Sequence, residues 1–204
     1  MRKKQLFFTS LGVLLLLSAL LFAGYNLFSE IRATDEAKKA FEKLGFSSFD
    51  ELSADEAQKQ KELPEYVLDP NMPMPEKEID GYKYVGYISI PALSVKLPVM
   101  SDWSYEKLTV SPCRYFGSAY LGNLIVAAHN YRNHFGRLSE LSPGDKVVFV
   151  DMKKNVFKYR VTETELLEPE DVEELKSGNW DLTLFTCTVG GQYRVTVRCE
   201  ASKK

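Results

Sequence analysis

The chain has 204 residues, which is enough for one domain of ordinary size with an accessory segment. Its 26 Lys and Arg residues nearly balance 28 Asp and Glu residues, so the formal net charge is −2. Because nucleic-acid binders carry a basic excess or a basic stripe, this balance argues against that class of protein.

An apolar run opens the chain and covers residues 6–28, with only small or neutral interruptions. About 20 apolar residues in a helix span a bilayer core, so this run predicts a single-pass transmembrane anchor. Basic residues at positions 2–4 precede it, which predicts that residues 1–5 are cytoplasmic and that the rest of the chain is extracellular. The alternative is a cleaved signal peptide, whose apolar region is usually only ~7–15 residues long.

A charged segment follows and, with a proline-rich linker, occupies residues 29–75. Ala37, Ala40 and Leu44 recur at helical spacing, and residues 53–56 resemble a capping box that opens a second short helix. Little in this segment would bury a core. The favoured interpretation is a solvated stalk, and the alternative is a helix that docks on the domain or covers its cleft.

Four prolines exclude regular helix from the linker, because proline lacks a backbone donor and fixes φ. They are Pro64, Pro70, Pro73 and Pro75. The favoured interpretation is an extended spacer, and the alternative is a lid that lies in a groove of the domain.

From residue 81 the sequence changes to short β-like runs separated by turn residues. Many short strands at regular spacing predict an all-β domain, either a closed barrel or a sandwich, over residues 76–204. A short helix or turn is expected at 169–176. The expected strands before the last hairpin cover residues 84–90, 93–99, 123–128, 146–151 and 156–165.

The last two strands form a predicted antiparallel hairpin. Residues 182–187 alternate in polarity, residues 188–191 supply a turn that contains two glycines, and residues 193–199 alternate again. This pairing would bring Arg194 close to Cys187 on the neighbouring strand.

That pair suggests thiol chemistry. A nearby cation favours the nucleophilic thiolate, and a guanidinium can donate two hydrogen bonds to a developing oxyanion. The proton carrier must be His129 or His134, the only histidines. The ordinary alternative for Cys187 is a buried core cysteine.

These segments resemble known motifs. Thr-Leu-Phe-Thr-Cys at 183–187 resembles the TLxTC signature of sortases, the cell-surface cysteine transpeptidases of Gram-positive bacteria. The sequence at 194–198 is similar to the family's catalytic arginine segment, and 127–130 resembles the segment that carries its histidine. Residues 86–91 and 97–99 look like its first strands, so the resemblance covers roughly residues 80–200.

The resemblance implies a closed, eight-stranded sortase-type β-barrel with short helices. It also implies roles for four residues. Cys187 would be the nucleophile, His129 the proton donor and acceptor, Arg194 the oxyanion ligand, and Thr186 a residue that helps to shape the oxyanion pocket. His134 and Arg198 remain as rivals for the histidine and arginine roles.

The other cysteines, Cys113 and Cys199, are expected to be structural. Three is an odd number, so at least one thiol is outside any intramolecular disulfide. An extracellular location permits Cys113 and Cys199 to pair, although two thiols pair only if their Cα atoms lie within ~7 Å. No CxxC pair or Cys/His cluster at zinc spacing occurs, so neither a metal nor a cofactor is expected.

The sequence therefore predicts a membrane-anchored sortase that cleaves an LPxTG-like sorting motif in secreted proteins through a thioester. The acyl group would pass to an amine of a peptidoglycan precursor or a pilin lysine. One alternative is a cysteine peptidase, in which water resolves the thioester. Another is a non-catalytic surface-binding module, which would need none of Cys187, His129 and Arg194.

Overall fold

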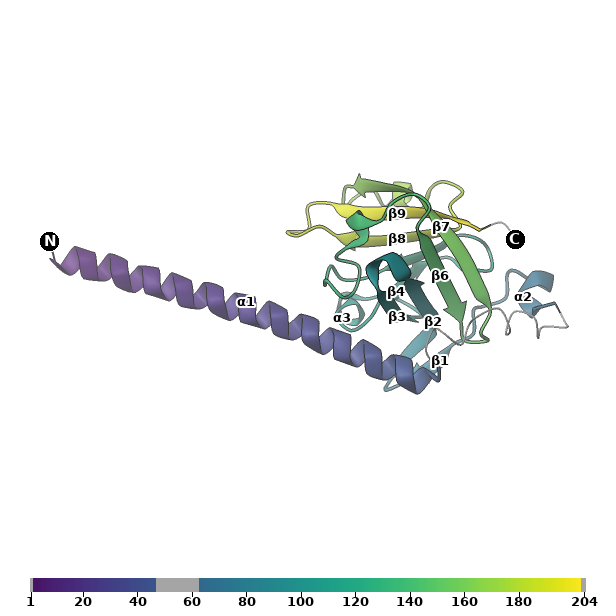
Figure 1. The fold of residues 1–204 in the computed structure, drawn as a ribbon, viewed down its shortest axis with the longest axis horizontal. Helices are drawn as coiled ribbons and strands as arrows, with labels where there is room; N and C mark the ends of the chain where they lie inside the picture. The colour runs from purple at the N-terminus through teal and green to yellow at the C-terminus, as the bar shows by residue number, and fades with distance from the viewer. Residues whose placement is uncertain (1, 47–62, 203–204) are drawn as a thin grey trace.

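The strands of the computed structural model form one sheet that closes on itself (Figure 1). The structure describes residues 2–46 and 63–202, and the short helix predicted around residues 53–56 lies outside them. The strand order is β1-β2-β3-β4-β5-β8-β9-β7-β6, and pairing of β2 with β6 closes the barrel. Because β1 pairs only with β2, eight of these strands form the ring, which confirms the predicted closed barrel of about eight strands.

The strands and helices have the following bounds. The strands are β1 Lys77–Ile79, β2 Tyr82–Ile90, β3 Val95–Met100, β4 Cys113–Phe116, β5 Leu124–Ala127, β6 Lys146–Asp151, β7 Val156–Leu167, β8 Leu182–Cys187 and β9 Arg194–Ala201. The helices are α1 Arg2–Leu44, α2 Glu65–Leu68, α3 Tyr105–Leu108 and α4 Val172–Lys176, with 3-10 turns at Pro91–Leu93 and Leu138–Glu140.

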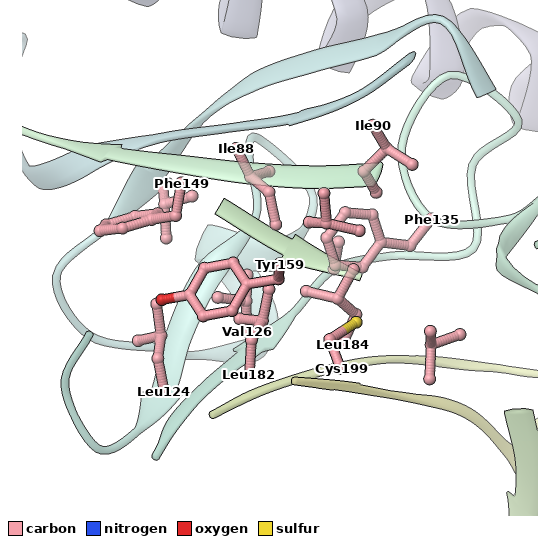
Figure 2. Close-up of a cluster of buried hydrophobic side chains, with 14 of the residues drawn as sticks. Ile88, Ile90, Leu124, Val126, Phe135, Phe149, Tyr159, Leu182, Leu184 and Cys199 are labelled. Carbon is pink, nitrogen blue, oxygen red and sulfur yellow. The ribbon is translucent and has the colours of Figure 1, made fainter. Parts of the chain in front are cut away.

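The barrel interior is filled by alternate residues of these strands. Leu182 and Leu184 of β8 point inward with Leu124 and Val126 of β5, and Tyr159 of β7 closes over them (Figure 2). Large side chains without solvent exposure fill the interior because successive strand residues face opposite sides of the sheet. The same alternation sends Thr183, Phe185 and Cys187 to the outside.

Helix α1 is one continuous helix of 43 residues. Its apolar side chains between residues 7 and 28 are exposed, and within the described residues it is the one helix that is long and apolar enough to cross a membrane. Further along, Ala33, Ala37, Ala40 and Leu44 are buried against the barrel. The solvated-stalk interpretation is therefore wrong for this part of the segment, and the docked helix is what the structure contains. Small alanines let the helix approach the strands closely.

The proline-rich linker packs on the barrel wall. The ring of Tyr66 in α2 stacks on Tyr120 with centroids 4.7 Å apart, and the buried sulfur of Met74 accepts a hydrogen bond from the Ala119 amide. Tyr120 precedes the start of β5, whereas Cys187 lies at the end of β8, which runs parallel to β5. The linker thus contacts the end of the barrel remote from the cysteine, and Figure 1 places α2 on the side opposite the β8–β9 turn.

Barrel closure depends on a glycine. A Cβ atom at Gly86 would lie 2.1 Å from the Val150 carbonyl oxygen, at the β2–β6 seam. We expect Gly86→Ala to lower the free energy of unfolding by about 1–3 kcal/mol, because the seam must open to admit the methyl group. Gly24→Ala, where nothing lies within 4 Å, is the control. Denaturant titration of the full chain in detergent would compare them, and equal stability of both variants would contradict this account.

Candidate active site

Cys187 and Arg194 face each other across the β8–β9 hairpin. They are register partners at the end of β8 and the start of β9. Directly opposite residues in an antiparallel pair project to the same side, with Cβ atoms ~4.5–5.5 Å apart. The glycines at positions 190 and 191 adopt φ of +87° and +71°, which allows the turn to follow the cysteine immediately. The predicted hairpin and its Cys–Arg pairing are confirmed.

His129 reaches the same place from the other side of β8. Ala127 of β5 is the parallel partner of Phe185, and the Ala128 amide donates a hydrogen bond of 3.2 Å to the Phe185 carbonyl. Ala127, the last residue of β5, faces outward, and His129 follows it by two residues. His129 therefore follows the end of β5, next to the end of β8 that carries Cys187. The order across the three strand ends is His129, Cys187, Arg194.

Thr186 fixes the spacing of these strand ends. Its buried hydroxyl donates a hydrogen bond of 2.9 Å to the Ala128 carbonyl. That bond joins the residue before Cys187 to the residue before His129. The predicted contribution of Thr186 to an oxyanion pocket stays a prediction, because its donor is used here to join the strands.

Arg194 has an uncommitted nitrogen. The guanidinium lies over the Phe185 ring, 5.5 Å from its centroid, which is a cation–π contact. Its buried Nη1 has no hydrogen-bond partner among the described residues. Buried donors in folded proteins are nearly always paired. A partner supplied by a bound substrate would satisfy this one.

Arg198, the rival arginine, is committed to structure. It is 2% exposed, and its guanidinium donates hydrogen bonds to the Glu165 carboxylate and the Leu175 and Glu174 carbonyls, at 2.6, 2.7 and 2.9 Å. These bonds tie the end of α4 to β7 and β9. Its burial and these bonds hold the Arg198 guanidinium inside the fold, away from the exposed thiol of Cys187.

The ring of His129 is half-buried and oriented by an aromatic stack. It lies on the Tyr131 ring with centroids 4.0 Å apart and planes 10° from parallel. Burial lowers the pKa of His129, and a hydrogen bond with Asn130 opposes the shift. The Asn130 amide also donates to the Thr188 carbonyl at 3.4 Å, which joins the histidine loop to the β8–β9 turn. The lowered pKa favours the neutral imidazole.

His134, the rival histidine, lies behind Tyr131. Its ring meets the Tyr131 ring edge-on at 5.5 Å and has no solvent exposure. Burial lowers its pKa to about 4, and neither ring nitrogen has a partner among the described residues. A histidine enclosed in this way cannot exchange a proton with a substrate at Cys187.

All three cysteines are free thiols, so the alternative of a Cys113–Cys199 disulfide is wrong. Cys113 and Cys199 are fully buried in separate apolar clusters, and burial raises the pKa of each to about 12. Only Cys187 is exposed. Among the residues that the structure describes, no three His, Cys, Asp or Glu side chains are grouped to hold a metal ion.

Sequence reasoning did not identify Tyr131 and Phe185 as site residues. Tyr131 supports the face of the His129 ring, and Phe185 supports the Arg194 guanidinium. The only sequence signal for these roles is that each is an aromatic residue two positions from His129 or Cys187. That spacing alone does not distinguish an aromatic site residue from an aromatic residue that simply packs in the core.

The fold and the arrangement of these side chains agree with comparisons to known proteins. The family model described as Sortase domain matches residues 88–202, which is more than half of the chain. The chain belongs to the sortase family.

Individual relatives are more distant. The chain is 30% identical over 118 residues to sortase A of Bacillus anthracis, covering 53% of this chain and 54% of that protein. It is 29% identical over 134 residues to sortase A of Streptococcus agalactiae, covering 58% and 53%. The chain thus spans about half the length of these curated relatives. The crystal structure of sortase C1 from Streptococcus agalactiae has a TM-score of 0.57 at 24% identity, covers 82% of this chain and 98% of that one, and shows the shared fold.

Replacing Arg198 should lower the free energy of unfolding more than replacing Arg194. We expect Arg198→Ala to lower the free energy of unfolding by about 2–4 kcal/mol, because it leaves the Glu165 carboxylate and two carbonyls without their donor. Arg194→Ala, the matched control, should cost less than about 1 kcal/mol, since it breaks no hydrogen bond that orders the fold. Denaturant unfolding of both variants tests this, and the reverse order would refute the assignment.

His134 should make the fold sensitive to acid. Its pKa is about 4 in the folded chain and about 6.5 when unfolded, so the unfolded state binds more protons between these values. Stability is full above pH 6.5 and should fall by up to about 3 kcal/mol as pH drops to 4. His134→Phe should lose this part of the pH dependence. Unfolding curves of the parent chain and His134→Phe at several pH values test this. If His134 did not contribute, the free energy of unfolding would change with pH by the same amount in both proteins.

Proposed function

We propose that the chain is a membrane-anchored sortase, a cysteine transpeptidase that acts on an LPxTG-like sorting motif of secreted proteins. The observation that carries the proposal is the register of β8, which sets Cys187 opposite Arg194 and beside His129. The end of β8 thus carries the nucleophile, and its neighbours supply the proton carrier and the oxyanion donor.

In the first half of the reaction, neutral His129 takes the proton of the Cys187 thiol, and the thiolate attacks the carbonyl carbon of the motif's threonine. Arg194 donates hydrogen bonds to the oxyanion that forms, through the nitrogen that lacks a protein partner. The C–N bond then breaks, and the leaving amine receives the proton held by His129. The product is a thioester between the donor acyl group and Cys187.

In the second half, a primary amine attacks the thioester carbonyl in its neutral form. His129 takes a proton from the attacking nitrogen, the C–S bond breaks, and the new amide leaves as Cys187 regains its proton. The stacked Tyr131 ring holds the imidazole in one orientation for both transfers. The amine comes from a peptidoglycan precursor or a pilin.

The donor motif has a small exposed apolar surface available next to the cysteine. Tyr193 and Val189 in the β8–β9 turn are exposed beside Cys187. Apolar side chains of a sorting motif would gain contacts with this surface.

The proposed domain organisation follows α1. Residues 6–28 form the membrane span, residues 1–5 lie in the cytoplasm, and residues 76–204 form an extracellular catalytic domain. The exposed apolar side chains of α1 support a bilayer environment, because water would leave them unfavourably hydrated.

The test is a thioester adduct. The full chain in detergent is mixed with a library of LPxTG-like peptides, with or without triglycine as the amine, and examined by mass spectrometry. We expect an acyl adduct on Cys187 that triglycine converts into an amide product, and no adduct with Cys187→Ala, because the other thiols are buried.

Arg194→Lys is the companion variant, since a single ammonium does not reproduce the fork of a guanidinium. It should lower the acylation rate by about 10²-fold or more. An adduct released only by water would identify a peptidase. A folded chain that forms no adduct with any peptide would refute the transpeptidase.

A further inference from the structure

A cleft of about 710 Å³ lies between helix α1 and the barrel. Tyr25, Ser29 and Ala33 line it from α1, and His129 and Tyr131 line it from the loop after β5. Its lining residues include neither Cys187 nor Arg194. The cleft therefore reaches the row of site residues from the His129 side.

The cleft wall formed by α1 is fixed to the barrel at both ends. Near His129, the Asn133 amide donates to the Glu30 carboxylate, and the Asn133 side chain donates to the Thr34 hydroxyl, both at 3.3 Å. At the far end, Lys43 forms a salt bridge of 2.6 Å with Asp80. The wall thus belongs to the folded structure, and it contacts the same loop that carries His129.

The chemistry of the second half-reaction requires such an approach. The incoming amine must lose a proton to the base as it attacks the thioester, so it has to arrive within hydrogen-bond reach of His129. The half-buried His129 ring lines this cleft, where an amine could approach it. The cleft is lined by three carboxylates, Glu36, Asp80 and Glu106, against two cations, Arg32 and Lys39, so it has an acidic excess to which Glu106 contributes and which would attract an ammonium group.

We propose that this cleft is the acceptor site and that α1, from the last turn of the apolar span onward, forms one of its walls. The inference rests on the proposed transpeptidase function and adds the class and the route of its second substrate. The occupant is a primary amine on a flexible chain. It enters along α1 and attacks the thioester next to His129, while the donor acyl group remains on the Arg194 side.

The cleft also opens next to the end of the apolar segment, at Tyr25 and Asn26. An amine displayed on a lipid surface and an amine free in solution share the chemistry that the cleft recognises. The experiment therefore uses triglycine both as a soluble peptide and attached to a lipid in the same bilayer.

The experiment measures how the acyl-enzyme partitions between amine and water. Full chain in lipid nanodiscs is acylated with a donor peptide, and the ratio of amide product to hydrolysis product is measured against triglycine concentration. This ratio does not depend on how fast each variant acylates. Ser29→Trp fills the cleft, whereas Lys38→Trp adds the same side chain to an exposed position of α1 outside it.

We expect Ser29→Trp to lower the partition ratio by about tenfold or more and Lys38→Trp to keep the parental value. Glu106→Gln should raise the triglycine concentration that gives half-maximal aminolysis severalfold, and it tests the site without added bulk. A higher ratio for lipid-attached triglycine would identify the membrane surface as the source of the amine, and equal ratios would identify solution.

Two results would overturn the proposal. Equal partition ratios for Ser29→Trp and Lys38→Trp, with Glu106→Gln at the parental value, would exclude the cleft as the acceptor route while leaving the transpeptidase intact. Absence of any acyl-enzyme in the parent chain would instead overturn the proposed function, and the acceptor site with it.

Discussion

The site depends on the register of one strand, β8, against its two neighbours. Antiparallel pairing with β9 sets Cys187 opposite Arg194, and parallel pairing with β5 brings His129 alongside. A slip of one residue would turn every side chain of β8 to the other face and bury the cysteine. The packing of Leu182 and Leu184 in the barrel interior therefore fixes the position of the Cys187 thiol on the outer face of β8.

Hydrogen bonds from both faces of the sheet add a second set of constraints that act on the same strands. Arg198 joins α4 to β7 and β9, and Thr186 joins the end of β8 to the end of β5. The Arg198–Leu175 and Thr186–Ala128 bonds are buried, so removing one partner would leave another polar group without compensation. The two arginines of β9 therefore differ: Arg198 is buried and stabilises the fold, whereas Arg194 lies at the start of the strand opposite Cys187.

Much of this arrangement was predictable from the sequence, because alternation specifies faces. The hairpin, the outward Cys187 and the facing Arg194 follow from period-2 patterns and a Gly-Gly turn. Docking of α1 did not follow, since an alanine stripe is too weakly apolar to distinguish a packed face from a solvated one. Strand β4 has only four residues, and the β2–β6 closure joins distant segments, so neither leaves a local signal. The choice between the histidines required burial, which only the folded chain defines.

The isolation of the exposed thiol has a consequence for oxidation. A cysteine converted to sulfenic acid is commonly rescued when a neighbouring thiol condenses with it to a disulfide, which reductants then open. Cys113 and Cys199 are sealed in the apolar interior, so neither can serve as that resolving thiol. Oxidised Cys187 would proceed toward the irreversible sulfinic state unless a thiol from another molecule reached it first. Its chemical lifetime therefore depends on the reducing capacity of its surroundings.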